Sequence, residues 1–311
     1  MEDASLGSRN VLEGVLALGN TVERAMPLTT PATPSALIVA HPGHQVRIHG
    51  WLESVRPRVF ILTDGSGRSG RPRLGSTTEY LAELGLRTGT IYGRFTERAI
   101  YQAMLRHDVD LFIGLADELA EAIVREQIEC VVGDATEGFN STHDVCRLLI
   151  NAAVEMATRS NSRRIANFDF PVIQRPDSCP EPLRPDAIWL HLDEDVFQRK
   201  LAVARKYYPG LIAELEAALD GTEEGPLRTY IELCGEGAAA TKYTGLDMFR
   251  VECLRPVAGG DERHPFWPHP PFYERHAEKL VATGHYEQVI RYREHILPLA
   301  EALWNHVERG A

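Results

Sequence analysis

Two histidines lie three positions apart directly after a short apolar run. Residues 36–40 (Ala-Leu-Ile-Val-Ala) have the length and continuous apolar character of a buried strand, and His41 and His44 follow in His-Pro-Gly-His. A third histidine, His143, stands far downstream in Asn-Ser-Thr-His-Asp, where the pattern predicts the start of a helix. Open α/β sheets build their sites at the carboxyl ends of their strands. Three imidazoles near such an edge suggest a metal site.

Neutral imidazole is a good ligand for zinc and for ferrous iron, and three protein ligands with an open position are typical of a catalytic metal. Zinc lowers the pKa of water at that position to about 7 and polarises a carbonyl oxygen, which is what amide hydrolysis needs. A histidine near a strand end is also often only hydrogen-bonded. That structural role is the alternative for His41 and His44.

The segments that must position these residues alternate between strand-like and helix-like patterns. The strands are continuous apolar runs, which is typical of a sheet covered on both faces. We therefore expect an α/β, Rossmann-like fold with a mostly parallel sheet, right-handed crossovers, helices on both faces and a C-terminal cap region. Strands are predicted at 37–40, 58–63, 88–92, 129–133, 165–172 and 188–192, and helices at 46–54, 77–84, 116–127, 143–159 and 195–219.

The chain divides into an appendage and one main domain. Residues 8–26 have mostly helical spacing and are followed by a proline-rich stretch, so 1–34 is predicted to be an N-terminal helix and linker. This helix packs back on the domain or forms an oligomer contact. Residues 35–311 are predicted to form a single domain, with a metal-site core at 35–172 and a C-terminal cap with helices at 173–311.

Composition and charge narrow the class of partner. The 311 residues are 44% hydrophobic and 25% charged, which is typical of a soluble globular protein. A formal charge of -11 argues against nucleic acid or an anionic membrane as the partner and favours a small-molecule substrate, while a homo-oligomer stays open. The sequence contains no run of about 18 apolar residues, so we expect no membrane-spanning helix. The five cysteines form no C-x-x-C pair, so we expect reduced thiols and a cytoplasmic location.

The order of the motifs resembles that of PIG-L/LmbE-type deacetylases over roughly residues 35–172. The resemblance implies a metal-dependent, usually zinc-dependent, enzyme that removes acetyl groups from the nitrogen of amino sugars or related compounds. The matching motifs are Ala40-His-Pro-Gly-His-Gln45, Thr63-Asp-Gly65, Arg73 before a helix ending in Leu84-Gly85, and Glu137-Gly-Phe-Asn-Ser-Thr-His143-Asp144.

Carried across by position, the resemblance makes His41 the first metal ligand and His143 the third. His44 takes the place of the second, which is usually an aspartate. This exchange removes a negative charge, so the metal becomes more electropositive and its water more acidic. Gln45 replaces the family's glutamate, and its amide could still hydrogen-bond a ligand, so we include it among the substrate-binding candidates.

Gly43 is the main departure, because the family normally has a general-base aspartate there. A hydrolase must then recruit another acid near the metal water. Glu137, Asp64 and Asp144 are the candidates at the same predicted sheet edge, together with Asp134, and the short loop that ends at His143 favours Glu137. The structural alternatives are that Asp64 caps a turn and that Asp144 orients a ligand or lies in the first helical turn.

Two segments are candidates for substrate binding. Residues 65–73 form a glycine-rich basic loop, in which Arg68 or Arg73 could clamp a carboxylate or phosphate. His269 lies in a proline- and aromatic-rich segment at 263–273 and could donate a proton to a leaving amine. The alternatives are a solvated loop and an ordered surface loop, respectively.

The leading hypothesis is a zinc-dependent amidohydrolase that removes an acyl group, such as acetyl, from the nitrogen of a small substrate. The substrate is sugar-like or an acylated intermediate of specialised metabolism. Two alternatives stay open. The three imidazoles could instead bind Fe²⁺ in an oxygen-dependent enzyme, and the missing aspartate is compatible with a non-catalytic binding protein.

Overall fold

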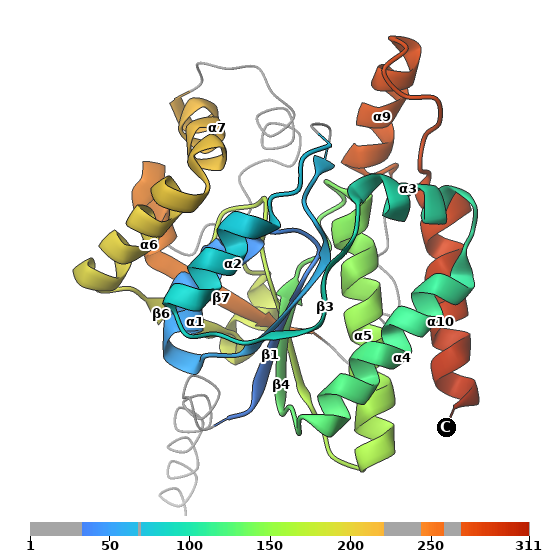
Figure 1. Cartoon of the computed structure of the whole chain (residues 1–311), viewed down its shortest axis with the longest axis horizontal. Helices are drawn as coiled ribbons and strands as arrows, with labels where there is room; N and C mark the ends of the chain where they lie inside the picture. The colour runs from blue at the N-terminus through green and yellow to red at the C-terminus, as the bar shows by residue number, and fades with distance from the viewer. Residues whose placement is uncertain (1–32, 68–69, 221–243, 258–268, 311) are drawn as a thin grey trace, which may run out of the picture.

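The computed structural model describes residues 33–67, 70–220, 244–257 and 269–310 (Figure 1). The helix predicted at 8–26 and the candidate Arg68 lie outside these residues. A single seven-stranded sheet forms the centre of the described part, in the order β3-β2-β1-β4-β5-β7-β6. Its strands are β1 (Ser35–Val39), β2 (Arg58–Thr63), β3 (Thr88–Phe95), β4 (Cys130–Asp134), β5 (Ala166–Phe170), β6 (Ile188–His191) and β7 (Val251–Pro256).

The sheet is mostly parallel, which confirms the predicted fold class. The neighbours from β3 to β5 pair in parallel, and β7 is antiparallel to both β5 and β6. From β1 the chain moves outward to β2 and β3, and then returns to place β4 on the other side of β1. The direction of winding therefore reverses between β1 and β4. In doubly wound sheets, ligands bind beyond the carboxyl ends of the strands at such a reversal.

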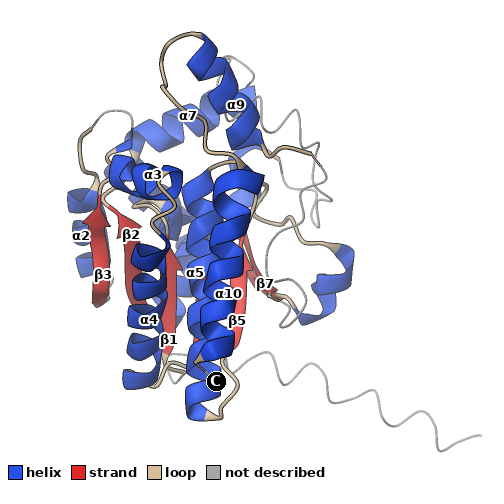
Figure 2. Ribbon diagram, turned by 90° about the vertical axis from the view of Figure 1, so that its right-hand side faces the viewer, coloured by secondary structure: helices blue, strands red, loops and turns tan. Residues whose placement is uncertain are grey.

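Helices cover both faces of the sheet because side chains of each strand alternate between them. In β1, Ala36 and Ile38 pack toward α4, α5 and α10, whereas Leu37 and Val39 pack toward α1, α2 and α6. Figures 1 and 2 show these two layers, with α7 and α9 beyond the carboxyl ends of the strands. The α-helices are α1 (His49–Val55), α2 (Leu74–Glu83), α3 (Glu97–Leu105), α4 (Val109–Arg125), α5 (Ser141–Asn161), α6 (Glu194–Tyr207), α7 (Pro209–Asp220), α9 (Phe272–Ala282) and α10 (Leu297–Arg309).

Shorter helical segments complete the described chain. The 3₁₀ helices are η2 (His44–Ile48), η4 (Glu181–Asp186) and η5 (Gly245–Arg250), and a π-helical turn, η6 (Tyr292–Ile296), leads into α10. None of the described helices is both long enough and apolar enough to cross a membrane.

The structure corrects several boundaries. The single helix predicted at 195–219 is two helices, because Pro209 cannot donate a backbone hydrogen bond and starts α7 instead. Helix α3 and strand β7 were not predicted. Strand β7 and the predicted β6 extend the central sheet, so the C-terminal region supplies strands to the main body as well as covering it.

Helix α5 packs closely on strands β1 and β4, directly below the candidate site. A Cβ atom on Gly133 would lie 2.5 Å from the carbonyl oxygen of Ile38 and 2.4 Å from the Ile150 side chain, so only glycine fits there. From α5, the buried Arg147 donates from Nε to the carbonyl oxygen of Asp134 (2.7 Å) and from Nη2 to that of Phe168 (3.1 Å). These contacts hold the start of α5 against β4 and β5.

Candidate metal centre

The three predicted histidines come together at the reversal between β1 and β4. The ring centroids lie 5.2 Å apart for His41 and His44, 4.9 Å for His41 and His143, and 4.5 Å for His44 and His143. His41 follows β1, His44 begins η2, and His143 lies in the first turn of α5. His41 and His143 are buried and His44 is half-buried.

Local backbone geometry explains this meeting. Gly43 has φ +112°, a left-handed conformation that glycine adopts without a side-chain clash, and it turns the chain between His41 and His44. At α5, the Asn140 side chain accepts a hydrogen bond from the backbone N–H of Thr142 (2.8 Å) and caps the helix. The cap begins α5 so that His143 falls in its first turn.

Two of the histidines have a buried carboxylate on Nδ1. His41 Nδ1 lies 2.5 Å from Glu97 Oε1 and 2.8 Å from Thr63 Oγ1. His44 Nδ1 lies 2.9 Å from Asp134 Oδ2, which also accepts a hydrogen bond from the backbone N–H of Ala40 (2.8 Å). A carboxylate on the outer nitrogen of a histidine is a common second layer of metal sites in proteins.

Sequence reasoning missed Glu97, although the signal was present. Glu97 comes two residues after the end of β3, directly behind the Thr96 cap of α3. The strand-end argument that singled out His41 therefore applied to it as well. The predicted strand stopped at residue 92, which left Glu97 without a place at the edge.

Burial sets the charge state of the centre. It lowers the pKa of His143 well below its usual value, and the neighbouring His44 and His41 lower it further. Burial also lowers the pKa of His44, and the charge of Asp134 opposes this only in part. For Glu97, burial favours the protonated form, but the charge and hydrogen bond of His41 outweigh it and the pKa falls. His44 and His143 are thus neutral at pH 7, as metal ligands must be.

The spacing of the rings fits a shared metal ion. Three imidazoles bound to one zinc ion at about 2.0–2.1 Å have ring centres about 5 Å apart. As they stand, no three His, Cys, Asp or Glu side chains among the described residues form a group that could hold a metal ion. The three rings meet edge to face at interplanar angles of 61° to 89°. His41 Nε2 and His143 Nδ1 are buried without a hydrogen-bond partner in the described part of the chain.

Glu137, the acid favoured from the sequence, is occupied in holding a loop. Its carboxylate accepts hydrogen bonds from the backbone N–H groups of Val172 (2.9 Å), Ile173 (2.9 Å) and Gln174 (2.8 Å). Burial raises its pKa, and the bonds from Gln174 and Ile173 offset part of this rise. These bonds give Glu137 a structural role in this loop, and its role as the general base stays a prediction.

The candidate acids Asp144 and Asp64 also accept hydrogen bonds from the backbone. Asp144 Oδ1 accepts hydrogen bonds from the backbone N–H groups of Glu137 and Gly138, both at 3.2 Å. Burial is the main reason that the pKa of Asp144 rises to about 8. Asp64 Oδ1 accepts a hydrogen bond from the backbone N–H of Ser66 (2.9 Å) and caps the turn after β2. For Asp64, this is the structural alternative drawn from the sequence.

Gln45 supports the histidine loop. It is fully buried, its Oε1 accepts a hydrogen bond from the backbone N–H of Gly43 (2.8 Å), and its Nε2 donates to Tyr208 Oη (2.6 Å). The Tyr208 hydroxyl also bonds Thr77 Oγ1 at 2.7 Å. Both ends of the Gln45 amide are thus engaged within the protein, and its role in substrate binding stays a prediction.

Of the two predicted substrate-binding arginines, Arg73 lies within the described residues. Its Nε donates to the carbonyl oxygen of Gly65 (2.7 Å), and its side chain is exposed. Its positive charge contributes to the lowered pKa of His44, which places it beside the centre. His269 is exposed, and no contact joins it to the three histidines in the described residues.

Apolar rings border the centre on the side of α9. The half-buried Phe139 lies 6.5 Å from the His143 ring and stacks on Phe272 at 5.3 Å with nearly parallel planes. The backbone N–H of Tyr273 donates to the carbonyl oxygen of Gly138 (3.1 Å) and ties α9 to this loop. Phe272 and Tyr273 are both buried and contribute to packing.

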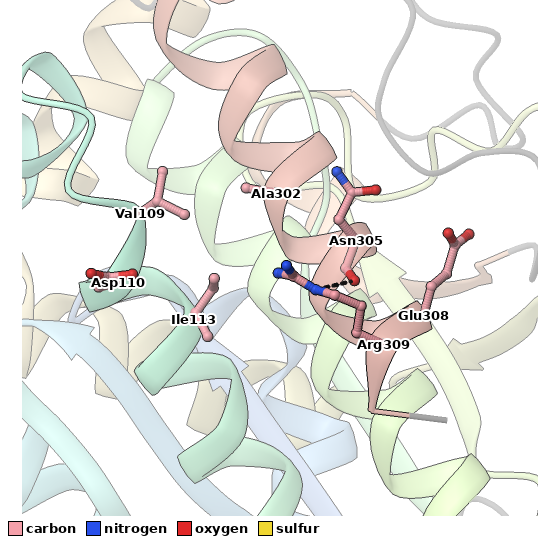
Figure 3. Close-up of a pocket in the computed structure, with 7 residues that line it drawn as sticks. All are labelled: Val109, Asp110, Ile113, Ala302, Asn305, Glu308 and Arg309. Atoms are coloured by element: carbon pink, nitrogen blue, oxygen red, sulfur yellow. Dashed lines mark hydrogen bonds between the residues drawn. The ribbon is translucent and has the colours of Figure 1, made fainter.

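A hollow detected on the surface lies away from the histidines, between α4 and α10 (Figure 3). It is open and mixed in polarity, and the histidine centre shares no residue with it. We therefore place the candidate site by its chemistry and its position on the sheet. The hollow is lined by Val109, Asp110, Ile113, Ala302, Asn305, Glu308 and Arg309.

No protein-family model matches the chain, and no curated protein matches it. Among solved structures, a zinc-inhibited teicoplanin deacetylase is similar at 14% identity and a TM-score of 0.45, over 74% of this chain and 100% of that one. The A40926 pseudoaglycone deacetylase is similar at 19% identity and a TM-score of 0.42, over 72% of this chain and 96% of that one.

Proposed function

We propose that the chain is a metal-dependent amidohydrolase that removes an acyl group, such as acetyl, from the nitrogen of a small substrate. His41, His44 and His143 are the proposed ligands, and zinc is the proposed metal. The observation that carries the proposal is the contact among three imidazoles at the winding reversal, two of them backed by buried carboxylates. The motif order that resembles PIG-L/LmbE deacetylases supports the same reaction.

The ligand set offers a reason why hydrolysis can proceed without an acid at position 43. Zinc held by neutral ligands lowers the pKa of water to about 7 and polarises a carbonyl oxygen. The chain contributes by keeping its ligands neutral, since burial lowers the pKa of His44 and of His143. Less proton abstraction is then left for a general base than in a site with an anionic ligand.

Arg73 is the proposed anchor for an anionic group of the substrate. Its backbone N–H donates to the carbonyl oxygen of Asp64 (2.8 Å) and its Nε to that of Gly65, so the side chain is fixed at its base. The guanidinium is exposed next to His44 and presents donors suited to a carboxylate or phosphate. We therefore propose an N-acylated substrate that is small, sugar-like and anionic.

The test combines metal analysis with an amide-hydrolysis assay. Protein purified without chelator should contain about one zinc per chain, and it should release amine from one or more N-acetylated amino sugars or acidic N-acyl compounds. Dipicolinate should abolish the activity and added Zn²⁺ should restore it.

The variant His44→Ala should lose the activity, because it removes one proposed ligand. His306→Ala is the matched control, since His306 pairs with Asp117 on the far side of the molecule. Absence of metal, or full activity in His44→Ala, contradicts the proposal. Bound iron with oxygen-dependent turnover would favour the oxygen-dependent alternative.

A further inference from the structure

The carboxylates of Glu97 and Asp134 stand directly behind two of the histidines, at the ends of β3 and β4. Neither belongs to the proposed ligand set, and both are buried, with 4% of Glu97 and none of Asp134 exposed. We propose that they are positioning residues that fix the Nδ1–H tautomers of His41 and His44 and so direct the Nε2 nitrogens to a divalent metal. This inference rests on the proposed function and deepens it.

The tautomer follows from the chemistry of the acceptor. An ionised carboxylate can only accept hydrogen bonds, so a ring nitrogen held against it must carry the proton. Glu97 Oε1 lies against two groups that can donate to it, His41 Nδ1 and the Thr63 hydroxyl. Its Oε1 lies 2.5 Å from His41 Nδ1, so that nitrogen is the donor. In neutral imidazole the remaining lone pair is then on Nε2, which is buried without a partner among the described residues.

The same reasoning applies to His44. Asp134 Oδ2 accepts from His44 Nδ1 at 2.9 Å and from the backbone N–H of Ala40 at 2.8 Å. The second bond comes from the end of β1, two residues before the bend at Pro42. Asp134 therefore links the carboxyl end of β4 to the loop that carries both His41 and His44. It orients the His44 ring, and it holds the backbone N–H of Ala40, the residue before His41.

Each carboxylate is itself held in place, which a positioning role requires. Glu97 Oε1 lies 3.0 Å from Thr63 Oγ1, at the end of β2. The main chain of Asp134 is fixed by the bond from Arg147 Nε to its carbonyl oxygen. Strands β1, β2, β3 and β4 thus converge on two imidazoles.

The direct test measures metal affinity and ring tautomers in the full-length protein. Long-range ¹H–¹⁵N NMR spectra of the zinc-free wild type should show His41 and His44 protonated on Nδ1. The variants Glu97→Gln and Asp134→Asn should bind Zn²⁺ about 10- to 100-fold more weakly, measured by competition with a chromophoric chelator. The visible spectrum of the Co²⁺-loaded protein should change in both variants.

Asp169→Asn is the matched control. Asp169 is a carboxylate on the neighbouring strand β5, pairs with Arg255 at 2.6 Å, and has no contact with the histidines among the described residues. Its loss should lower the melting temperature but leave zinc affinity within about twofold, since no bond to a ligand changes. Thermal unfolding of each variant separates this loss of stability from loss of metal binding.

The outcomes distinguish this inference from the proposed function. Unchanged zinc affinity in folded Glu97→Gln and Asp134→Asn, or Nε2–H tautomers in the wild type, would overturn the inference. The NMR measurement needs no variant, so it decides the matter even where a substitution prevents folding. A wild type that binds zinc and hydrolyses no amide contradicts the proposed function and leaves the positioning role intact.

Discussion

Replacing Glu137 with glutamine tests whether this carboxylate is catalytic or structural. In the wild type its two oxygens accept hydrogen bonds from the backbone N–H groups of three consecutive residues, Val172, Ile173 and Gln174. The N–H of Ile173 lies within reach of both oxygens, so it keeps an acceptor whichever way the new amide turns. One of the other two N–H groups must face an NH₂ group instead. Glu137→Gln therefore removes one charge-assisted bond and leaves one buried donor without an acceptor.

The loss of stability in Glu137→Gln follows from the one bond removed and the one donor left without an acceptor. A hydrogen bond to a charged group contributes about 1.5–3 kcal/mol, and a buried donor left unsatisfied costs about 1–3 kcal/mol, with overlap between the two figures. Lower desolvation cost for the neutral amide offsets part of this loss. We expect a net destabilisation of about 2–4 kcal/mol, which for a domain of this size lowers the melting temperature by about 2–4 °C per kcal/mol.

The assay is thermal unfolding together with zinc affinity and kcat/KM of the loaded enzyme. Because both Glu137 oxygens accept backbone hydrogen bonds from the loop at 172–174, zinc affinity and kcat/KM should stay within about threefold of the wild type below the melting transition. Denaturant unfolding should give the same loss of free energy as heating. A fall of about 100-fold or more in kcat with an unchanged melting temperature would refute the structural role and restore Glu137 as the general base.

Three further predictions concern other parts of the molecule. Gly43→Asp should cost about 1–2 kcal/mol of stability, because the backbone at this position has φ +112°. The added Cβ would lie 3.6 Å from the Tyr208 ring, which is ordinary contact. The substitution should change kcat/KM less than about tenfold, and a larger gain would show that the missing base limits the enzyme. Lys200→Met should lower the free energy of unfolding by about 3–5 kcal/mol in denaturant titrations, since it leaves the Glu252 charge, 2.8 Å from Lys200 Nζ, buried without its partner; an unchanged midpoint would contradict this. Burial raises the pKa of the Cys130 thiol to about 12, so native protein at pH 8 should resist a disulfide-exchange reagent at this residue until it is unfolded; rapid labelling, located by peptide mass spectrometry, would exclude such burial.

Much of the fold was predictable because the strands under the site are continuous apolar runs. Strand β2 was predicted with the boundaries that it has in the structure, and β1 and β4 were displaced by only a residue or two. Strand β7 (Val251–Pro256) was missed because charged Glu252 and Arg255 interrupt its apolar pattern. Both side chains are nevertheless buried, since Lys200 neutralises the first and Asp169 the second. A single-residue pattern cannot reveal partners that the fold brings from distant segments.

At the centre, the proposed metal ligands could be predicted from the sequence, whereas the roles of the acids could not. His41 and His44 were selected because imidazoles follow a predicted buried strand, and His143 was selected from its motif at a predicted helix start. The three rings are found together. An acid at a strand end is ordinary, and its role depends on which donor it meets. Glu137 meets three backbone N–H groups, whereas Glu97 meets an imidazole nitrogen. Their sequence contexts do not distinguish these outcomes, because the donors come from other elements.

Gly43 affects both the acids of the centre and the position of His44. A glycine at that position removes one acid from the centre, and its left-handed backbone directs His44 toward Asp134. The acid that supports this histidine therefore acts through the imidazole ring and has no need to reach the water itself. If that arrangement does replace a general base, activity should depend more steeply on Asp134 than on any acid at position 43. Comparison of kcat and zinc affinity between Asp134→Asn and Gly43→Asp tests this ordering, and equal losses in the two variants would contradict it.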